Sequence, residues 1–240
     1  MLGYPVSLHF INKFAKKNSI KTDSKLKPIV SVIIPAHNEE AVIHQKLENL
    51  INLKYPKELL EIIISSDNST DRTNEIVEEF IKQHNDFNIK LYIVGKRQGK
   101  TNAQNEAVRI ASGEILVFSD ANAMLDKDAV THLVSSFTDD DIIYVTGKLV
   151  YVNNLDSIAS AAESTYWNYD LFMRKVESDV KTITAGNGAI YAIRKREYVN
   201  FDPISCHDSA MPVYAALHHK RALFNEKAVA YEKAGATAED

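Results

Sequence analysis

Short apolar runs rich in β-branched residues alternate with amphipathic stretches along the first 150 residues of the chain. Alternation of this kind is typical of βαβ units, in which a helix crosses over between two parallel strands. The pattern predicts strands at 29–35, 61–66, 89–95, 114–119 and 141–150, separated by helices at 39–53, 70–84, 99–111 and 126–137. We therefore expect an α/β fold with a mostly parallel central sheet and helices on both of its faces.

The rhythm changes after Val150. The expected elements are then a long helix at 154–178, a β segment at 182–193 and a further helix at 209–218. Gly186 and Gly188 interrupt the β segment, and two glycines so close together indicate a bend or a place where a ligand approaches the backbone. The polar, lysine-rich stretch 16–28 resembles a linker, so we expect a leader at 1–27 and one domain at 28–240.

The charge of the chain is unevenly distributed. Its formal net charge is −4, and residues 1–28 contribute six lysines against one aspartate, a local balance of +5 that leaves −9 for the rest. An acidic body argues against nucleic-acid binding, which needs a basic surface on the fold itself. Residues 4–14 mix apolar and aromatic side chains, which suits a helix at a lipid interface and equally a helix packed on its own domain.

Cys206 is the only cysteine of the chain, so no internal disulfide can form. This composition favours a reducing compartment such as the cytosol. His207 adjoins Cys206, but adjacent residues rarely point toward each other, so we expect Cys206 to be structural and not a nucleophile.

Two acids directly follow predicted strands. Asp67 comes after the run 62–66, and Asp120 comes after the run 114–119. In open parallel sheets, ligands bind in the crevice outside the carboxyl ends of the strands. Because carboxylates at such a crevice suit a hard cation and a diphosphate, the pattern predicts a nucleotide site with a divalent metal ion.

Six short motifs follow one another between residue 28 and the end of the chain. They are Val30 to Glu40, Ser66 to Thr73, Arg97 to Ala103, Ser119-Asp120-Ala121-Asn122, Gly186 to Arg194, and His207-Asp208. Together they resemble the family-two inverting glycosyltransferases of the GT-A type, especially the membrane polysaccharide-synthase-like branch. The resemblance implies a GT-A nucleotide-diphospho-sugar transferase fold, with a nucleotide-binding half at 28–150 and an acceptor-binding half at 151–240.

The resemblance implies a site for a UDP-sugar at the strand ends. Its residues would be Pro35, Ala36, Asn38, Glu39, Asp67, Arg97, Lys100 and Asp120. Asp120 and Asn122 occupy the family's Asp-x-Asp position, which implies that they hold Mg²⁺ or Mn²⁺, more weakly than two carboxylates would. The residues alone also allow Asn38 and Asp120 to be helix N-caps, and Arg97 with Lys100 to be a solvated charge pair.

The second half is implied to carry the catalytic base and the acceptor site. Asp208 matches the position of the base, and the residues alone also allow it to be a helix N-cap. His207 stands where relatives carry an acid, and would either orient Asp208 or be solvated. The positions that resemble the acceptor face are Trp167, Gly186, Asn187 and Gly188. Aromatic residues at helical spacing are also common in cores, so Trp167 has that second interpretation.

These residues predict a direct displacement at the sugar's anomeric carbon. Asp208 would remove the proton of the acceptor hydroxyl, while the metal ion, Arg97 and Lys100 would stabilise the departing UDP. By resemblance, the chain is expected to be the catalytic portion of a membrane synthase at the cytoplasmic face of the cell membrane. Its acceptor would be a glycan or a lipid-linked sugar, and flanking membrane helices would anchor it.

Three other classes of function stay open at this point. One is a sugar-nucleotide-binding or regulatory module with impaired catalysis, and another is a nucleotidyltransferase. The third is a dinucleotide-dependent oxidoreductase. It is disfavoured because the first strand leads into Pro35-Ala36-His37-Asn38 and not into a glycine-rich turn.

Overall fold

The computed structural model describes residue 13 and residues 21–152 and 158–233, with side chains from residue 169 onward in the second range. Its strands are β1 (Val30–Ala36), β2 (Leu60–Ser66), β3 (Asn88–Ile93), β4 (Ile115–Phe118), β5 (Met124–Leu125), β6 (Ile142–Tyr151), β7 (Tyr191–Arg194) and β8 (Arg221–Glu232). Its α-helices are α2 (Ile43–Ile51), α3 (Thr73–Gln83), α4 (Lys100–Ile110), α5 (Ala129–Ser135), α6 (Ile158–Val180) and α7 (His207–Leu217). Short 3₁₀ turns cover Lys57–Leu59 and Lys195–Glu197.

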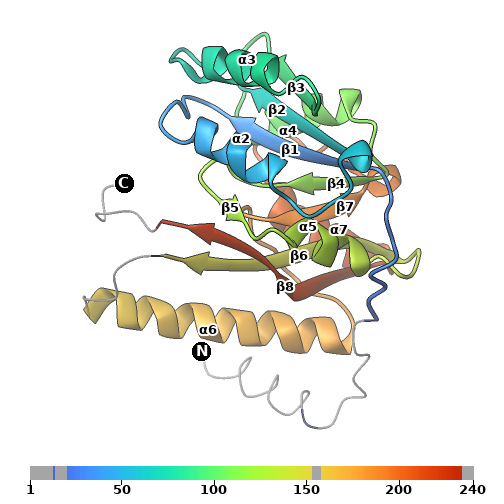
Figure 1. The fold of residues 1–240 in the computed structure, drawn as a ribbon. Helices are drawn as coiled ribbons and strands as arrows, with labels where there is room; N and C mark the ends of the chain where they lie inside the picture. The colour runs from blue at the N-terminus through green and yellow to red at the C-terminus, as the bar shows by residue number, and fades with distance from the viewer. Residues whose placement is uncertain (1–12, 14–20, 153–157, 234–240) are drawn as a thin grey trace.

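The eight strands form one sheet in the order β3-β2-β1-β4-β7-β6-β8-β5 (Figure 1). The pairs β1–β2, β2–β3, β1–β4 and β6–β8 are parallel, whereas β7 is antiparallel to β4 and β6, and β5 is antiparallel to β8. Only β7 and β5 therefore run against the other described strands, and the sheet is mostly parallel, as predicted.

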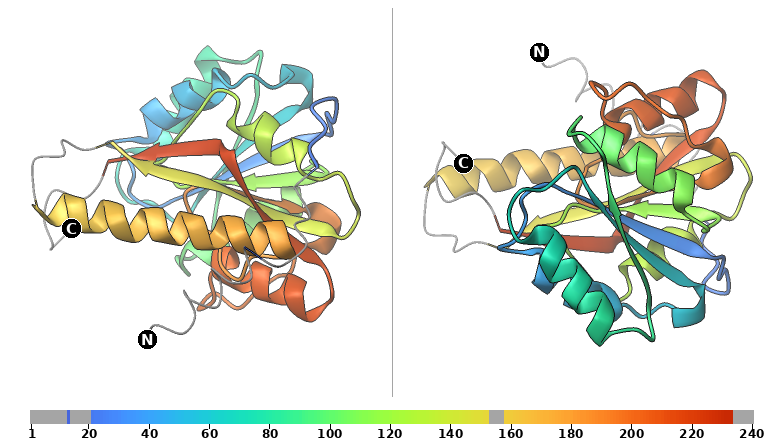
Figure 2. Two further views of the ribbon diagram at one scale, coloured as in Figure 1. Left: turned by 90° about the horizontal axis from the view of Figure 1, so that it is seen from below. Right: turned by 90° about the horizontal axis from the view of Figure 1, so that it is seen from above.

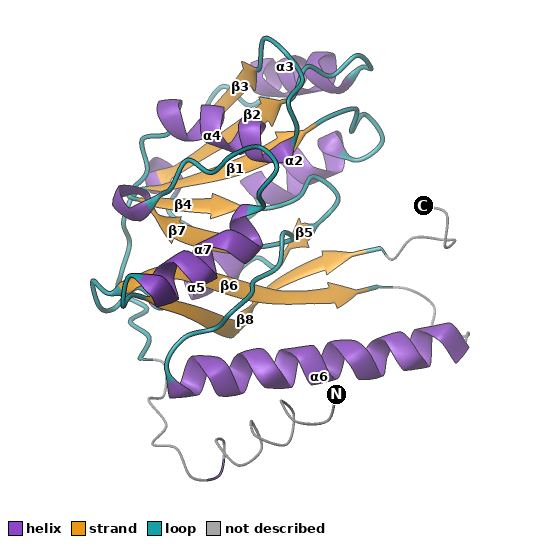
Figure 3. Ribbon diagram, turned by 180° about the vertical axis from the view of Figure 1, so that it is seen from behind, coloured by secondary structure: helices purple, strands orange, loops and turns teal. Residues whose placement is uncertain are grey.

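Helices cover both faces of the sheet because alternate strand residues point to opposite sides. On β1, Val32 and Ile34 belong to the core shared with α2, α3 and α5. Ile33 belongs to the core on the other face, which includes residues of α4 and α7. Figure 3 shows α4 and α7 in front of the sheet. A strand buried on both faces reads as a nearly continuous apolar run, which explains why β1 was predictable.

The long helix α6 runs alongside β8 (Figure 2). The backbone N–H of Phe224 on β8 donates a hydrogen bond of 2.9 Å to Ser178 Oγ on α6. Among the described residues, none belongs to a helix that is long and apolar enough to cross a membrane. The described part of the predicted leader contacts the domain, because the backbone N–H of Asp23 donates to the carbonyl oxygen of Ser135 at 2.8 Å.

Several predicted boundaries were wrong. The segment 182–193 is a strand only from Tyr191, and β8, the longest strand described, was not predicted. Asp120 is not a helix cap, because residues 121–122 form a turn before β5. Asn38 is not an N-cap either, because α2 begins at Ile43 and Asn38 has a left-handed φ of 55°.

Candidate functional site

A hollow of about 280 Å³ opens at the carboxyl ends of β1, β2 and β4. It is lined by Pro35, Ala36, His37, Glu39, Asp67, Lys100, Asp120, Ala121 and Asn122. The sequence predicted seven of these nine residues as ligands of the nucleotide or the metal ion. His37 and Ala121 also line the hollow, although the motifs that contain them did not single them out.

Asp67 connects the end of β2 to the loop that precedes α4. Its side chain is buried, and its carboxylate accepts the backbone N–H groups of Gln98 at 3.0 Å and Gly99 at 2.7 Å. Gly99 has φ of 93°, a conformation that favours glycine, and it directly precedes Lys100. Asp67 therefore fixes the start of α4 and with it the backbone of Lys100. Each carboxylate oxygen can still accept a further hydrogen bond from a ligand.

Two predicted nucleotide ligands do not line the hollow. Asn38 joins the loop after β1 to the loop after β2. Its backbone N–H donates to Ser69 Oγ at 3.2 Å, and its Oδ1 accepts the backbone N–H of Thr70 at 2.8 Å. Arg97 is exposed on the loop before α4. Asp71 lies just before α3, where its Oδ1 accepts the backbone N–H of Thr73 at 3.0 Å.

Gly188 lies where the start of α4, the turn after β4 and the first turn of α7 come together. A Cβ atom added there would lie 3.0 Å from Lys100 Nζ, 3.2 Å from Asp120 Oδ2 and 3.6 Å from Asp208 Oδ2. Lys100 also forms an ion pair with Asp120 Oδ1. The catalytic base, the metal ligand and the diphosphate cation predicted from the sequence thus surround one small space that glycine leaves open.

Glu232, at the end of β8, is a further acid beside this space, and it was not predicted because β8 was not. Burial and the nearby charge of Asp120 raise its pKa, against a side-chain hydrogen bond with Asn122 that lowers it. Burial and Asp120 also raise the pKa of Glu39. In the described part of the chain, no three His, Cys, Asp or Glu side chains form a group that could hold a metal ion by themselves.

Asp208 lies in the first turn of α7, and Cys206 is the N-cap residue. His207 is not solvated: it is buried, with Nδ1 3.1 Å from Gln104 Oε1 and Nε2 3.1 Å from the carbonyl oxygen of Val199. Burial lowers the pKa of His207 to about 4, so the ring is neutral at pH 7. These contacts fix the start of the helix and thereby the backbone of Asp208.

The predicted acceptor residues divide into two groups. Gly186 and Gly188 lie beside Asp208, and the backbone N–H of Gly186 donates to the carbonyl oxygen of Asp208. Asn187 uses its side chain within the fold, because Nδ2 donates to the carbonyl oxygen of Gly147 at 2.7 Å and Oδ1 accepts the backbone N–H of Ile190 at 3.1 Å. Trp167 belongs to α6, but its side chain lies outside the described residues.

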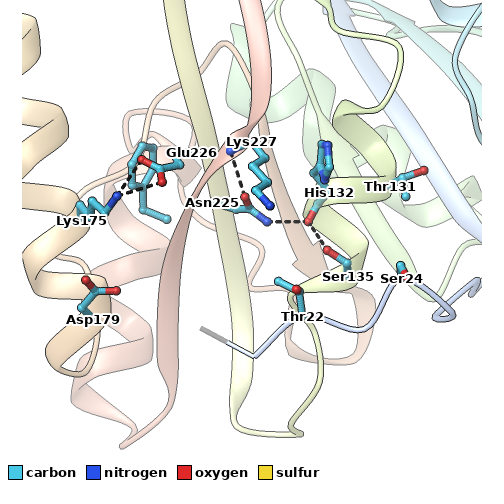
Figure 4. Close-up of a pocket in the computed structure, with 11 residues that line it drawn as sticks. Thr22, Ser24, Thr131, His132, Ser135, Lys175, Asp179, Asn225, Glu226 and Lys227 are labelled. Carbon is cyan, nitrogen blue, oxygen red and sulfur yellow. Dashed lines mark hydrogen bonds and ion pairs between the residues drawn. The ribbon is translucent and has the colours of Figure 1, made fainter. Parts of the chain in front are cut away.

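A second hollow, of about 390 Å³, lies between residues 22–24, α5, α6 and β8 (Figure 4). It contains none of the predicted ligands. Lys175 is paired with Glu226 at 2.9 Å, and Asn225 Nδ2 donates to the carbonyl oxygen of His132 at 2.8 Å. Because these polar groups bond one another and no strand-end acid lies there, we assign the functional site to the smaller hollow.

The fold and the strand-end acids define a GT-A glycosyltransferase domain. The structure matches a solved mannosyltransferase from Pyrobaculum calidifontis in complex with GDP-Man and Mn²⁺, with a TM-score of 0.82 and 25% identity over 99% of this chain and 66% of that one. The chain belongs to glycosyl transferase family 2, whose model matches residues 31–200.

Two curated relatives resemble part of the chain. The probable glycosyltransferase YdaM of Bacillus subtilis is 42% identical over 137 residues, which are 55% of this chain and 32% of YdaM. A beta-monoglucosyldiacylglycerol synthase of Nostoc is 29% identical over 163 residues, which are 67% of this chain and 35% of the synthase. The match thus spans about a third of the length of each relative.

Proposed function

We propose that this domain transfers a sugar from a UDP-sugar to a hydroxyl acceptor, with inversion at the anomeric carbon. The observation that carries the proposal is the convergence of Lys100, Asp120 and Asp208 around the space left open by Gly188. An ammonium group, a metal-type carboxylate and a candidate base within one small space are the groups that this reaction needs.

The residues present fit a divalent cation shared with a diphosphate. Asp120 offers a carboxylate and Asn122 an amide oxygen, both hard ligands, and Glu232 adds negative charge beside them. Mg²⁺ or Mn²⁺ bound by Asp120 and Asn122 would neutralise charge on the leaving diphosphate. Lys100, now paired with Asp120, would neutralise a phosphate oxygen of the bound donor.

Asp208 is the proposed general base. Its carboxylate accepts the proton of the acceptor hydroxyl as that oxygen forms a bond to the anomeric carbon. The bond between this carbon and the diphosphate oxygen breaks at the same time, and its electron pair leaves with UDP. Because the two events occur on opposite sides of the carbon, the configuration is inverted.

The acceptor is proposed to be a glycan or a lipid-linked hydroxyl at the cytoplasmic face of the cell membrane. The similarity to a glucosyldiacylglycerol synthase supports a lipid-associated acceptor. The glycines at 186 and 188 support a site close to Asp208, since a backbone without side chains lets an acceptor approach.

A thermal-shift panel tests the proposal with UDP-glucose, UDP-N-acetylglucosamine, UDP-galactose and GDP-mannose, each with and without Mn²⁺. At least one UDP-sugar should raise the melting temperature more with Mn²⁺ than without, because a ligand that binds the folded state stabilises it. A shift confined to GDP-mannose would contradict the proposal that the donor is a uridine nucleotide. Turnover assays with the bound donor should release UDP, and release of pyrophosphate would instead identify a nucleotidyltransferase.

A further inference from the structure

Lys46 is a fully buried lysine on the apolar face of α2. The other buried residues of this helix are Ile43, Leu47 and Leu50, so Lys46 occupies one position of the i, i+3, i+4, i+7 stripe that faces the core. A charged side chain at such a position is costly unless its donors are satisfied. The contacts of its ammonium group therefore indicate why a lysine is there.

The ammonium group of Lys46 holds both ends of the loop that carries the metal-binding motif. It donates to Ser119 Oγ at 2.7 Å and to the carbonyl oxygen of Ala123. Asp120 and Asn122 lie between these two residues. One buried ammonium group thus contacts the residues immediately before and after the predicted metal ligands, through a hydroxyl at Ser119 and a main-chain carbonyl at Ala123.

The same network reaches the loop that contains Gly188. Ser119 Oγ donates a hydrogen bond of 2.7 Å to the carbonyl oxygen of Ala189. Lys46 is therefore linked through one hydroxyl to the residue next to Gly188. This connection joins α2, the end of β4 and the loop before β7.

The charge of Lys46 is balanced by carboxylates to which it is not hydrogen-bonded. Its hydrogen bonds go to a hydroxyl and a main-chain carbonyl, and the charges that act on it belong to Asp120 and Glu232. Burial lowers the pKa of Lys46 to about 7. An apolar side chain would avoid this cost, so the hydrogen bonds to the loop are the physical reason that favours lysine.

We propose that Lys46 is a positioning residue that fixes the 119–123 loop and couples it to residues 188–189, so that Asp120 and Asn122 are held ready for a metal ion and a nucleotide. The part that concerns the ligand rests on the function proposed above. The part that concerns the loop depends only on the hydrogen bonds of Lys46.

Hydrogen–deuterium exchange of the free 240-residue chain tests the positioning role. In Lys46→Met, amides in peptides covering 119–125 and 186–190 should exchange at least fivefold faster, because both loops lose their shared anchor. The matched control is Lys195→Met, which removes another lysine that donates to a main-chain carbonyl, that of Ala111, far from the hollow. The control should leave these two peptides unchanged, and unchanged exchange in Lys46→Met as well would overturn the proposal.

Binding of Mn²⁺ with UDP, followed by the electron paramagnetic resonance signal of free Mn²⁺, tests the consequence for the ligand site. Affinity should fall at least tenfold in Lys46→Met, and Lys46→Gln, which keeps a shorter neutral donor, should recover part of it. If the loop amides of Lys46→Met exchange faster but Mn²⁺ and UDP bind with wild-type affinity, the coupling of Lys46 to the ligand site is overturned.

If the wild-type chain binds neither UDP nor Mn²⁺, the proposed function fails, while the exchange comparison still decides the role of Lys46. If Lys46→Met does not fold, Lys46→Gln takes its place in both measurements, with smaller changes expected in the same direction.

Discussion

The backbone N–H of Gly186 donates a hydrogen bond of 2.9 Å to the carbonyl oxygen of Asp208. The loop before β7 is thereby attached to the first turn of the helix that carries the proposed base. Tyr144 completes this junction, because its hydroxyl lies 3.4 Å from the same carbonyl oxygen. The position of Asp208 therefore depends on what fits at residue 186.

Gly186→Ala should destabilise the fold by about 1–3 kcal/mol, the usual cost of overpacking a buried site. The new Cβ would lie 1.9 Å from Tyr144 Oη and 2.9 Å from the carbonyl oxygen of Asp208, and Tyr144 is fully buried. Urea denaturation measures the change. Tyr144→Phe, which removes the clashing oxygen, should recover part of the loss in the double variant. The control is Gly95→Ala, where nothing lies within 4 Å of an added Cβ, and equal effects at the two glycines would refute this account.

Asp208→Asn should lower the rate of sugar transfer at least about a hundredfold, because an amide cannot accept the proton. Nucleotide affinity and melting temperature should change little, since the main-chain contacts of residue 208 remain. Turnover assays and calorimetric titration with UDP and Mn²⁺ measure these effects separately. Asp202→Asn, in the connection that leads to α7, serves as the control. Loss of UDP binding in Asp208→Asn would show that this side chain has a structural role and is not the base.

Lys100→Met should change two affinities in opposite directions. Asp120 loses the ammonium group that now competes with a metal ion, so Mn²⁺ alone should bind about two- to fivefold more tightly, as for a partly exposed ion pair. UDP without metal should bind more weakly, because the phosphates lose a cation. Titrations with each ligand alone measure the two effects. Lys96→Met, at an exposed lysine on the loop before α4, should leave both affinities within about twofold of wild type. Weaker Mn²⁺ binding in Lys100→Met would contradict the competition between Lys100 and the metal ion for Asp120.

Acid should destabilise the fold through His207. Its pKa is lowered from 6.5 to about 4 in the folded state, so between these pH values the unfolded chain binds a proton that the folded chain does not. The free energy of unfolding should therefore fall by about 3 kcal/mol as the pH drops from 6.5 to 4, and this contribution levels off below pH 4.

The difference between wild type and His207→Gln in urea denaturation at several pH values isolates this contribution, because other titrating groups are common to both proteins. The variant should show a shallower loss of stability between pH 6.5 and 4. His218→Gln, at an exposed histidine, should follow the wild-type curve. Parallel curves for wild type and His207→Gln would exclude His207 as the source.

In the first half of the fold, β1, β2 and β4 were predictable because they are buried along their whole length and read as apolar runs. β8 was not, because it carries charged side chains such as Glu226 and Lys227 where its pairing with β6 shifts register. A strand with a bulge loses the strict alternation on which sequence patterns depend. The proximity of Glu232 to Asp120 could not be foreseen for the same reason.

The candidate site was predictable as a set of motifs but not as an arrangement. The acids at the strand ends follow from the rule for parallel sheets, and Asp67 and Asp120 both line the hollow. The meeting of Lys100, Asp120 and Asp208 at Gly188 depends on β7 turning back between β4 and β6, which no local pattern indicates. Lys46 did leave a signal, a lysine in the apolar stripe of a helix, but only the contacts show its purpose.

Because β7 pairs with β4 on one side and β6 on the other, the strands before and after α6 share one continuous hydrogen-bonded sheet. Strand pairing of this kind opposes the hinge motion by which enzymes with two lobes close around their ligands. Shielding of the reacting atoms from solvent must then come from loops folding over the rim, and altered selectivity should be sought in those loops, not in the angle between lobes.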